Sequence, residues 1–172
     1  MSNAAPSSPP VTAAPAAAPA DWLRLDLQLC FALYSSSLAM TKLYKPLLAP
    51  LGLTYPQYLV MLVLWESDGL AVSALGQRLG LDSGTLTPLL KRLESQGLVE
   101  RRRSAQDERR VDIHLTDAGR GLREQAVRIP EQLACASACS LDELQTLTRQ
   151  LQDLRSSLLH HLEQMDSTLP PG

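Results

Sequence analysis

The stretch VSALGQRLGLDSGTLTPLLKRLESQGLVERRRSAQDERRVDIHL, residues 72–115, decides the fold. A short helix capped by Ser73 is predicted over 74–79, and 80–82 form a tight connection. A second helix follows and reaches Ser95. Two short helices joined by a turn of about three or four residues are typical of a helix-turn-helix, whose second helix enters the DNA major groove.

The second helix has one apolar face and one polar face. Asp82 or Ser83 can cap its first turn, and Gly97 supplies the C-terminal stop. The apolar stripe consists of Leu86, Leu89, Leu90 and Leu93. The opposite, candidate DNA-binding face carries Ser83, Thr85, Thr87, Pro88, Lys91 and Arg92. Hydroxyls near the N-terminus of a recognition helix can reach base edges or phosphates, and basic side chains supply charge.

Alternating residues directly after this helix predict a β-hairpin. Its strands are 98–102 and 110–115, and 104–109 form the loop. A hairpin in this position is a wing, and Arg109 at its tip can enter the narrow minor groove of A/T-rich DNA. Asp107 can hold Arg109 by a charge-assisted hydrogen bond. Solvated charges on a surface hairpin are the competing interpretation, but helix, turn, basic helix and wing follow in the right order.

Charge is distributed unevenly along the chain. The 172 residues carry a net charge of −2. Residues 78–110 hold eight basic and five acidic side chains, so this window is +3 and the remainder is −5. A basic stretch in an acidic chain is the electrostatic footprint that phosphate binding needs.

The flanking sequence is helical and places the hairpin in a mainly α fold. Large apolar residues recur at helical spacing from about Leu25 to Leu48, and Pro46 with the segment 50–52 marks the end of that helix. Thr54 can cap the next helix, with a proline in its first turn. Two helices follow the wing. The first is expected to begin at Thr116, and Pro130 should bend or break the helix that contains it. The second is expected over 141–165, after a capping box at Ser140.

The expected organisation is one domain, over 21–166, between two tails. Residues 1–20 are almost entirely Ala, Pro and Ser, which predicts a disordered tail, and 167–172 form a flexible C-terminus. No signal peptide is visible, and the apolar run 22–48 is interrupted by charges, so we expect no membrane association. The expected setting is cytoplasmic, in which thiols are free.

Four segments resemble the winged-helix core of MarR-type transcriptional regulators: LGQRL (75–79), LLKRLESQGLV (89–99), DERR (107–110) and LTDAG (115–119). The resemblance covers about 26–165. It implies a homodimer in which the helices of 25–50 and 116–166 interlock and two winged domains, 72–115, read the half-sites of a palindromic double-stranded DNA operator. The apolar flanking helices support dimerisation independently.

Cys30 is the second candidate site. A cysteine between Leu29 and Phe31 is most often a small, inert core residue. However, all four tyrosines of the chain fall in the same N-terminal third, where hydroxyls can stabilise a thiolate. The run 27–65 resembles the organic-hydroperoxide-sensing OhrR group of MarR regulators. That resemblance implies that Cys30 is the redox-sensing thiol and that Tyr44 and Tyr55 hydrogen-bond it.

The same resemblance implies a resolving cysteine for the two-cysteine subtype. Cys135 and Cys139 lie four positions apart, at spacing compatible with one helical face near the break at Pro130. The resemblance favours Cys135, with Cys139 as the less favoured alternative. A disulfide requires Cα atoms within about 7 Å. Recognition helices must lie about 34 Å apart on DNA. If Cys30 and Cys135 are farther apart than disulfide distance in the DNA-binding form, an intersubunit bond between them must move helices, and the operator is then expected to be released.

Three other functions compete with peroxide sensing. A MarR-type regulator released by a small aromatic ligand in the cleft between dimer helices and DNA domain would leave Cys30 structural. A thiol peroxidase is disfavoured, because no reductant motif or catalytic His/Asp set accompanies the thiol, and no enzyme activity is expected. A purely architectural DNA binder is disfavoured by the small basic patch. No cofactor is expected, and no metal site either, since His114, His160 and His161 lack ligand spacing.

Overall fold

The computed structural model describes residues 22–103 and 110–168. The chain packs as two compact units, residues 1–39 and 40–172, which are described separately below. Helix α1 (Leu29–Leu48) contributes residues to both units. Within the described ranges no single helix has the length and apolar character to cross a membrane, although the bent pair 29–51 and 55–66, at 66°, meets both criteria together.

The first unit holds a short helical turn and the start of α1. The 3-10 helix η2 (Leu25–Leu27) is followed by Gln28 in extended backbone, at φ −84° and ψ 118°. The expected continuous helix from Leu25 is therefore wrong, because this extended residue interrupts it and α1 begins at Leu29. The large apolar side chains of the segment are exposed, among them Trp22, Leu23, Leu25, Leu29, Leu33 and Leu38.

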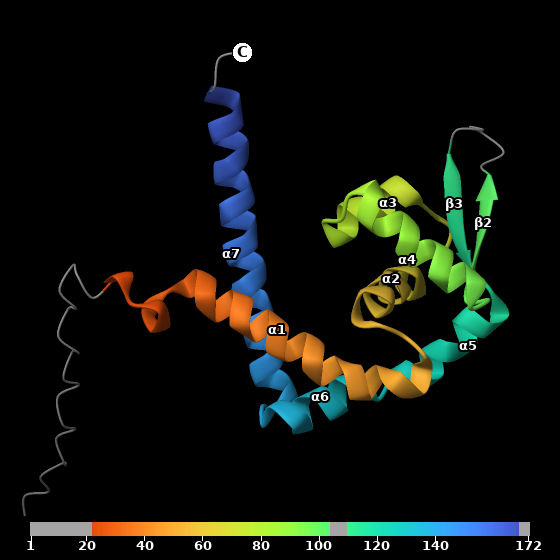
Figure 1. Ribbon diagram of the computed structural model, residues 1–172, viewed down its shortest axis with the longest axis horizontal. Helices are drawn as coiled ribbons and strands as arrows, with labels where there is room; N and C mark the ends of the chain where they lie inside the picture. The colour runs from red at the N-terminus through yellow and green to blue at the C-terminus, as the bar shows by residue number, and fades with distance from the viewer. Residues whose placement is uncertain (1–21, 104–109, 169–172) are drawn as a thin grey trace, which may run out of the picture. The chain divides into compact units, whose positions relative to one another are not determined.

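The second unit is a helical domain with one small sheet (Figure 1). After α1 its elements are η3 (Ala49–Leu51), α2 (Tyr55–Glu66), β1 (Leu70–Ala71), α3 (Val72–Leu79), α4 (Ser83–Ser95), β2 (Val99–Arg103), β3 (Val111–Leu115), α5 (Asp117–Ala126), α6 (Ile129–Ser137) and α7 (Leu141–Thr168). The expected class, mainly α with a β-hairpin wing, is confirmed.

Helix α2 lies at the centre of this unit and contacts α3, α4, α5 and β3. Thr54 is the N-cap residue of α2 and forms a capping box with Gln57, and Pro56 lies in the first turn. The expected cap at Thr54 is thus confirmed. Buried apolar side chains from the surrounding elements complete one core, with Val60, Met61, Leu64, Leu75, Leu86, Leu90, Leu93 and Ile113 each at most 1% exposed.

The sheet has three antiparallel strands in the order β1-β3-β2. The predicted hairpin is β2 and β3, and Val99 pairs with Leu115 at its base. Strand β1 was not predicted, and it changes the start of α3. Ala71 pairs with Asp112 and is the N-cap residue, so Ser73 lies inside α3 and the predicted cap at Ser73 is wrong.

Proline acts differently at the two ends of this region. Helix α1 ends at Leu48, as expected, and Pro46 lies inside its last turn. The 3-10 helix η3 follows, and Gly52 adopts φ +64° after it. Pro130 lies in the first turn of α6, where its missing N–H costs no intrahelical hydrogen bond. The predicted break at Pro130 is confirmed, because α5 ends at Ala126.

The last helix begins at the predicted capping box. Ser140 N donates to Glu143 Oε2 at 2.8 Å, and Glu143 N donates to Ser140 Oγ at 3.2 Å. Helix α6 packs on α7. Along α7, apolar side chains recur three or four residues apart and are exposed or half-buried: Leu144, Leu147, Leu151, Leu154, Leu158, Leu162 and Met165. This spacing is that of a helix whose stripe packs against another helix.

Candidate nucleic-acid interface and thiol site

Helix α4 is held as a recognition helix by a carboxylate cap. Asp82 Oδ1 accepts a hydrogen bond from Thr85 N at 2.8 Å, and Oδ2 accepts from Thr85 Oγ1 at 2.9 Å. The backbone N–H of Thr85, then its hydroxyl, hold the pKa of the Asp82 carboxyl below its usual value. Of the two predicted caps, Asp82 is therefore the correct one. The carboxylate is charged at neutral pH, and its negative charge interacts favourably with the positive N-terminal end of the helix dipole.

Two predicted contact hydroxyls already donate within the helix. Thr85 Oγ1 donates to the cap, and Thr87 Oγ1 donates to Ser83 O at 2.6 Å. In this arrangement the hydroxyl hydrogen of each threonine is already used, so the hydroxyl does not donate to a phosphate. Each hydroxyl oxygen can still accept a hydrogen bond from the amino group of a base. Ser83, Thr85 and Pro88 are exposed, whereas Thr87 is half-buried. Base edges are thus better partners than phosphates for these two threonines.

Residues 78–110 present fewer unpaired basic side chains than their eight lysines and arginines suggest. Among the described residues, Lys91 and Arg92 of α4 are exposed and make no ion pair, as expected of phosphate-binding side chains. Several other arginines of the basic window are paired: Arg78 with Glu66, Arg101 with Glu94, Arg102 with Glu100 and Arg110 with Asp112. The predicted tip residues Asp107 and Arg109 lie outside the described residues.

Arg103 is a candidate contact that the sequence reasoning missed. It ends β2, is exposed, and forms no ion pair with any residue in the described ranges. Arg101 and Arg103 lie on one face of the strand and Arg102 on the other, because side chains alternate along a strand. Reading the run 101–103 with that alternation would have identified Arg103.

A groove lies beside the contact between α4 and the hairpin. Its volume is about 520 Å³, and it lies between the start of α3, Thr87 of α4 and the part of the hairpin that holds Arg101 and Val111, away from the base. Polar side chains at its wall are Ser73, Thr87, Arg101 and Arg110. Figure 1 shows the hairpin β2–β3 beside α4. A major-groove helix and a flanking wing therefore belong to one surface of this unit.

Cys30 is a free and exposed thiol in the first turn of α1, in the first unit. Its exposure is unlike that of an inert core cysteine. The first unit also holds Tyr34, which is 62% exposed.

The remaining tyrosines form an aromatic cluster in the second unit. The ring centroid of Tyr44 lies 4.7 Å from that of Tyr55 and 5.8 Å from that of Tyr58, and Tyr58 meets Trp65 edge-on at 6.2 Å. Burial, then repulsion from the charge that Tyr58 and Tyr55 would carry, raises the pKa of Tyr44 to about 12. Burial likewise raises the pKa of Tyr55. Both phenols therefore stay protonated at neutral pH and can donate to an anion.

Cys135 and Cys139 differ in environment. Cys135 is free and exposed in the last turn of α6. Cys139 is half-buried beyond the helix end at Ala138, and its Sγ lies 3.4 Å from Ser137 O. The expectation that both lie on one helical face is wrong, because the left-handed backbone of Ala138, at φ 54°, ends α6 between them. No group of three potential metal ligands occurs in the described ranges.

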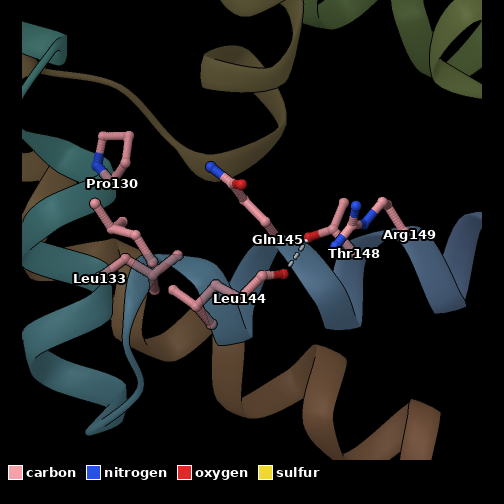
Figure 2. Close-up of a pocket in the computed structure, with 7 residues that line it drawn as sticks. Pro130, Leu133, Leu144, Gln145, Thr148 and Arg149 are labelled. Atoms are coloured by element: carbon pink, nitrogen blue, oxygen red, sulfur yellow. Dashed lines mark hydrogen bonds between the residues drawn. The ribbon is translucent and has the colours of Figure 1, made fainter.

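Two cavities lie next to the helices that follow the wing. One of about 420 Å³ lies between α6 and α7, with Leu133 and Leu144 on its apolar wall and Gln145, Thr148 and Arg149 at its polar edge (Figure 2). The other, of about 200 Å³, lies between α2, α5 and α6. Small-molecule sites usually measure about 300–1,000 Å³, so only the first has the volume of such a site.

Comparison with known proteins places this arrangement in a family. The family described as transcriptional regulator SarA/Rot matches residues 42–126. The organic hydroperoxide resistance transcriptional regulator of Bacillus subtilis is 52% identical over 138 residues, which are 80% of this chain and 94% of that protein.

Two solved structures extend the comparison. One, of disulfide-formed AbfR, a protein of Staphylococcus epidermidis, has a TM-score of 0.56 and 40% identity, over 78% of this chain and 95% of that one. The other, a MarR mutant from Escherichia coli complexed with operator DNA, has a TM-score of 0.65 and 27% identity, over 73% and 92%. These relatives are regulators of transcription rather than enzymes. The chain belongs to the MarR-type winged-helix family of DNA-binding transcriptional regulators, in its organic hydroperoxide resistance branch.

Proposed function

We propose that this regulator is a repressor that senses organic hydroperoxides through Cys30. The observation that carries the proposal is a free, exposed thiol in a chain 52% identical to an organic hydroperoxide resistance regulator. Tyr44 and Tyr55 are the proposed hydrogen-bond donors to the thiolate. Their proximity to each other and their protonated state at neutral pH support this role.

The proposed chemistry has two steps. The Cys30 thiolate attacks the O–O bond of the hydroperoxide, which leaves Cys30 as a sulfenic acid and the peroxide as an alcohol. The thiol of the partner subunit's Cys135 then displaces the sulfenic oxygen, so that a disulfide forms and water leaves. We favour Cys135 over Cys139 because it is exposed, whereas Cys139 is half-buried.

The proposed working form is a homodimer on a palindromic operator, in the cytoplasm. The exposed apolar stripe of α7 supports dimerisation, since stripes of this kind bury themselves against another helix. Ser83, Thr85, Thr87, Pro88, Lys91 and Arg92, with Asp107 and Arg109 of the wing, are the proposed DNA contacts. An intersubunit disulfide would constrain the helices and change the spacing of the two copies of α4, which releases the DNA.

The test is a gel shift on the gene's own upstream DNA, with reduced and cumene-hydroperoxide-treated protein. Wild type, Cys30→Ser, Cys135→Ser and Cys139→Ser are compared, and each sample is also run on a non-reducing gel. We expect oxidised wild type and Cys139→Ser to form crosslinked dimers and lose the DNA, and Cys30→Ser to do neither. DNA binding that persists despite complete crosslinking would refute the mechanism.

Release by a small aromatic ligand is the second candidate function. The α6–α7 cavity favours it, because its volume and its apolar wall with Arg149 at the edge suit a small aromatic carboxylate. The same gel shift separates the two functions. A Cys30→Ser protein that is still released by the inducer would support the ligand and assign Cys30 a structural role.

A further inference from the structure

One polar side chain lies within the apolar core of the second unit. Gln57, in the first turn of α2, is 3% exposed, and no other polar or charged residue of the described ranges is buried. A buried amide must pair both its carbonyl and its amino group, since a partner lost from the interior is not replaced by water. The hydrogen-bond partners of Gln57 therefore indicate the structural role of this buried amide.

Gln57 links the start of α2 to the end of α4. Its Oε1 accepts from Thr54 N at 2.9 Å and from Thr54 Oγ1 at 2.8 Å. Its Nε2 donates to Gln96 Oε1 at 3.1 Å, and Gln96 Nε2 donates to Gly52 O at 3.0 Å. We call Gly52, Thr54, Gln57 and Gln96 the amide bridge. The backbone donor of Thr54 and the acceptor of Gly52 orient both amides consistently along it.

The amide bridge connects two segments that have different roles. Gln96 is the C-cap of α4, and its backbone N–H donates to Arg92 O at 3.0 Å. Tyr55 lies between Thr54 and Gln57, and its ring lies 4.7 Å from that of Tyr44. The bridge thus ties the turn that carries Tyr55 to the last turn of the recognition helix, across 39 residues of sequence.

We propose that Gln96 is a positioning residue that couples the redox state of the thiol to the orientation of α4 through the amide bridge. This inference rests on the proposed function, in which Tyr55 hydrogen-bonds the Cys30 thiolate. Disulfide formation removes that acceptor, and in this proposal the first turn of α2 then changes position. Apolar contacts allow surfaces to slide, whereas directional hydrogen bonds favour a joint movement of the two segments that they connect. Gln96 is exposed, but its side chain bonds to both Gln57 and Gly52, so in this proposal the C-terminus of α4 follows the turn.

The experiment measures coupling rather than affinity. Fluorescence anisotropy gives Kd for the upstream DNA with reduced and with fully disulfide-bonded protein, and the ratio of the two Kd values is the coupling. Wild type is compared with Gln96→Leu, which removes both side-chain hydrogen bonds. Ser95→Ala is the matched control, because the Ser95 hydroxyl bonds only within α4, to Arg92 O. Non-reducing gels measure the disulfide in each sample.

We expect Gln96→Leu to form the disulfide as wild type does and to bind DNA when reduced. Its Kd ratio should be about fivefold smaller than that of wild type, which corresponds to about 1 kcal/mol of coupling. Ser95→Ala should keep the wild-type ratio. Gln96→Glu still accepts from Gln57 but cannot donate to Gly52, so its ratio should fall too, and it serves if the leucine variant does not fold.

A wild-type ratio in Gln96→Leu and Gln96→Glu, with complete disulfide formation, would overturn the positioning role. If both Kd values have then risen by the same factor, Gln96 only stabilises the fold. If wild type itself keeps the DNA when oxidised, the proposed function has failed, and the wild-type sample alone shows this.

Discussion

Replacing Gly119 with alanine tests how tightly the wing is joined to α5. A Cβ at this position would lie 2.0 Å from Leu98 O and 3.3 Å from a methyl group of Leu115, where ordinary contacts are 3.4–4 Å. Leu98 O cannot easily withdraw, because it accepts a hydrogen bond from Thr116 N at 3.1 Å. The backbone of α5 must therefore move by more than about 1 Å, and it carries the Gly119 carbonyl that accepts from Trp65 Nε1.

The loss of stability in Gly119→Ala can be compared with the effect of the same substitution at Gly121. Overpacking costs about 3 kcal/mol at the upper end of its usual range, and replacing a helical glycine returns up to about 1 kcal/mol. We expect Gly119→Ala to lower the free energy of unfolding by about 2 kcal/mol, or Tm by about 4–8 °C for a chain of this size. Gly121→Ala, in the same helix, meets nothing within 4 Å and should be about 0.5–1 kcal/mol more stable than wild type.

The assay is urea unfolding and thermal melting of the three proteins at one protein concentration. Gel shifts with reduced protein follow, because a displaced α5 should also displace the hairpin and weaken DNA binding. Equal stability of Gly119→Ala and Gly121→Ala would refute the reasoning, since it would mean that Leu98 can move away from the new methyl group at little cost.

Three further predictions concern charge and pH. Lys91→Ala and Arg103→Ala should each lower the slope of log Kd against log salt by about one, while the ion-paired Arg102→Ala should change it less; anisotropy titrations at several salt concentrations measure this. Folding lowers the pKa of Asp82, so the carboxylate stabilises the fold above the unfolded pKa of 3.8. This contribution is lost as pH falls through the lower pKa of the folded protein. In urea unfolding at different pH values, Asp82→Asn should lack this loss of stability in acid. The Tyr44 pKa is raised, so stability should fall as pH rises from 10.0 through about 12, and Tyr44→Phe should lack the last step of the tyrosinate absorbance titration.

Local rules predicted most of the helix boundaries and the wing. The cap at Asp82 and the capping box at Ser140 depend on residues within four positions of each other, which the sequence displays directly. The misplaced start of α3 has a different origin. Strand β1 has two residues, too few for any periodicity, and it exists because Leu70 pairs with Ile113, 43 positions downstream.

The site follows the same division between local and distant contacts. Lys91 and Arg92 could be assigned to the DNA face from helical spacing alone. The pairing of Arg101 with Glu94, and of Gln57 with Gln96, depends on how α4 packs on β2 and α2. No sequence pattern encodes those distances, so the charge available to DNA was overcounted and the amide bridge was not predicted. The roles of Cys30 and Cys135 came from resemblance and stay predictions.

The contact of Trp65 with Tyr58 also provides a spectroscopic reporter. The chain has two tryptophans, and Trp22 is 62% exposed in the first unit. A Trp22→Phe protein would retain a single indole, whose ring lies 6.2 Å from Tyr58 and whose N–H is bonded to Gly119 O at 2.9 Å. Its emission wavelength and its quenching by iodide would follow the junction of α2 and α5 in real time, without any attached dye, while peroxide is added.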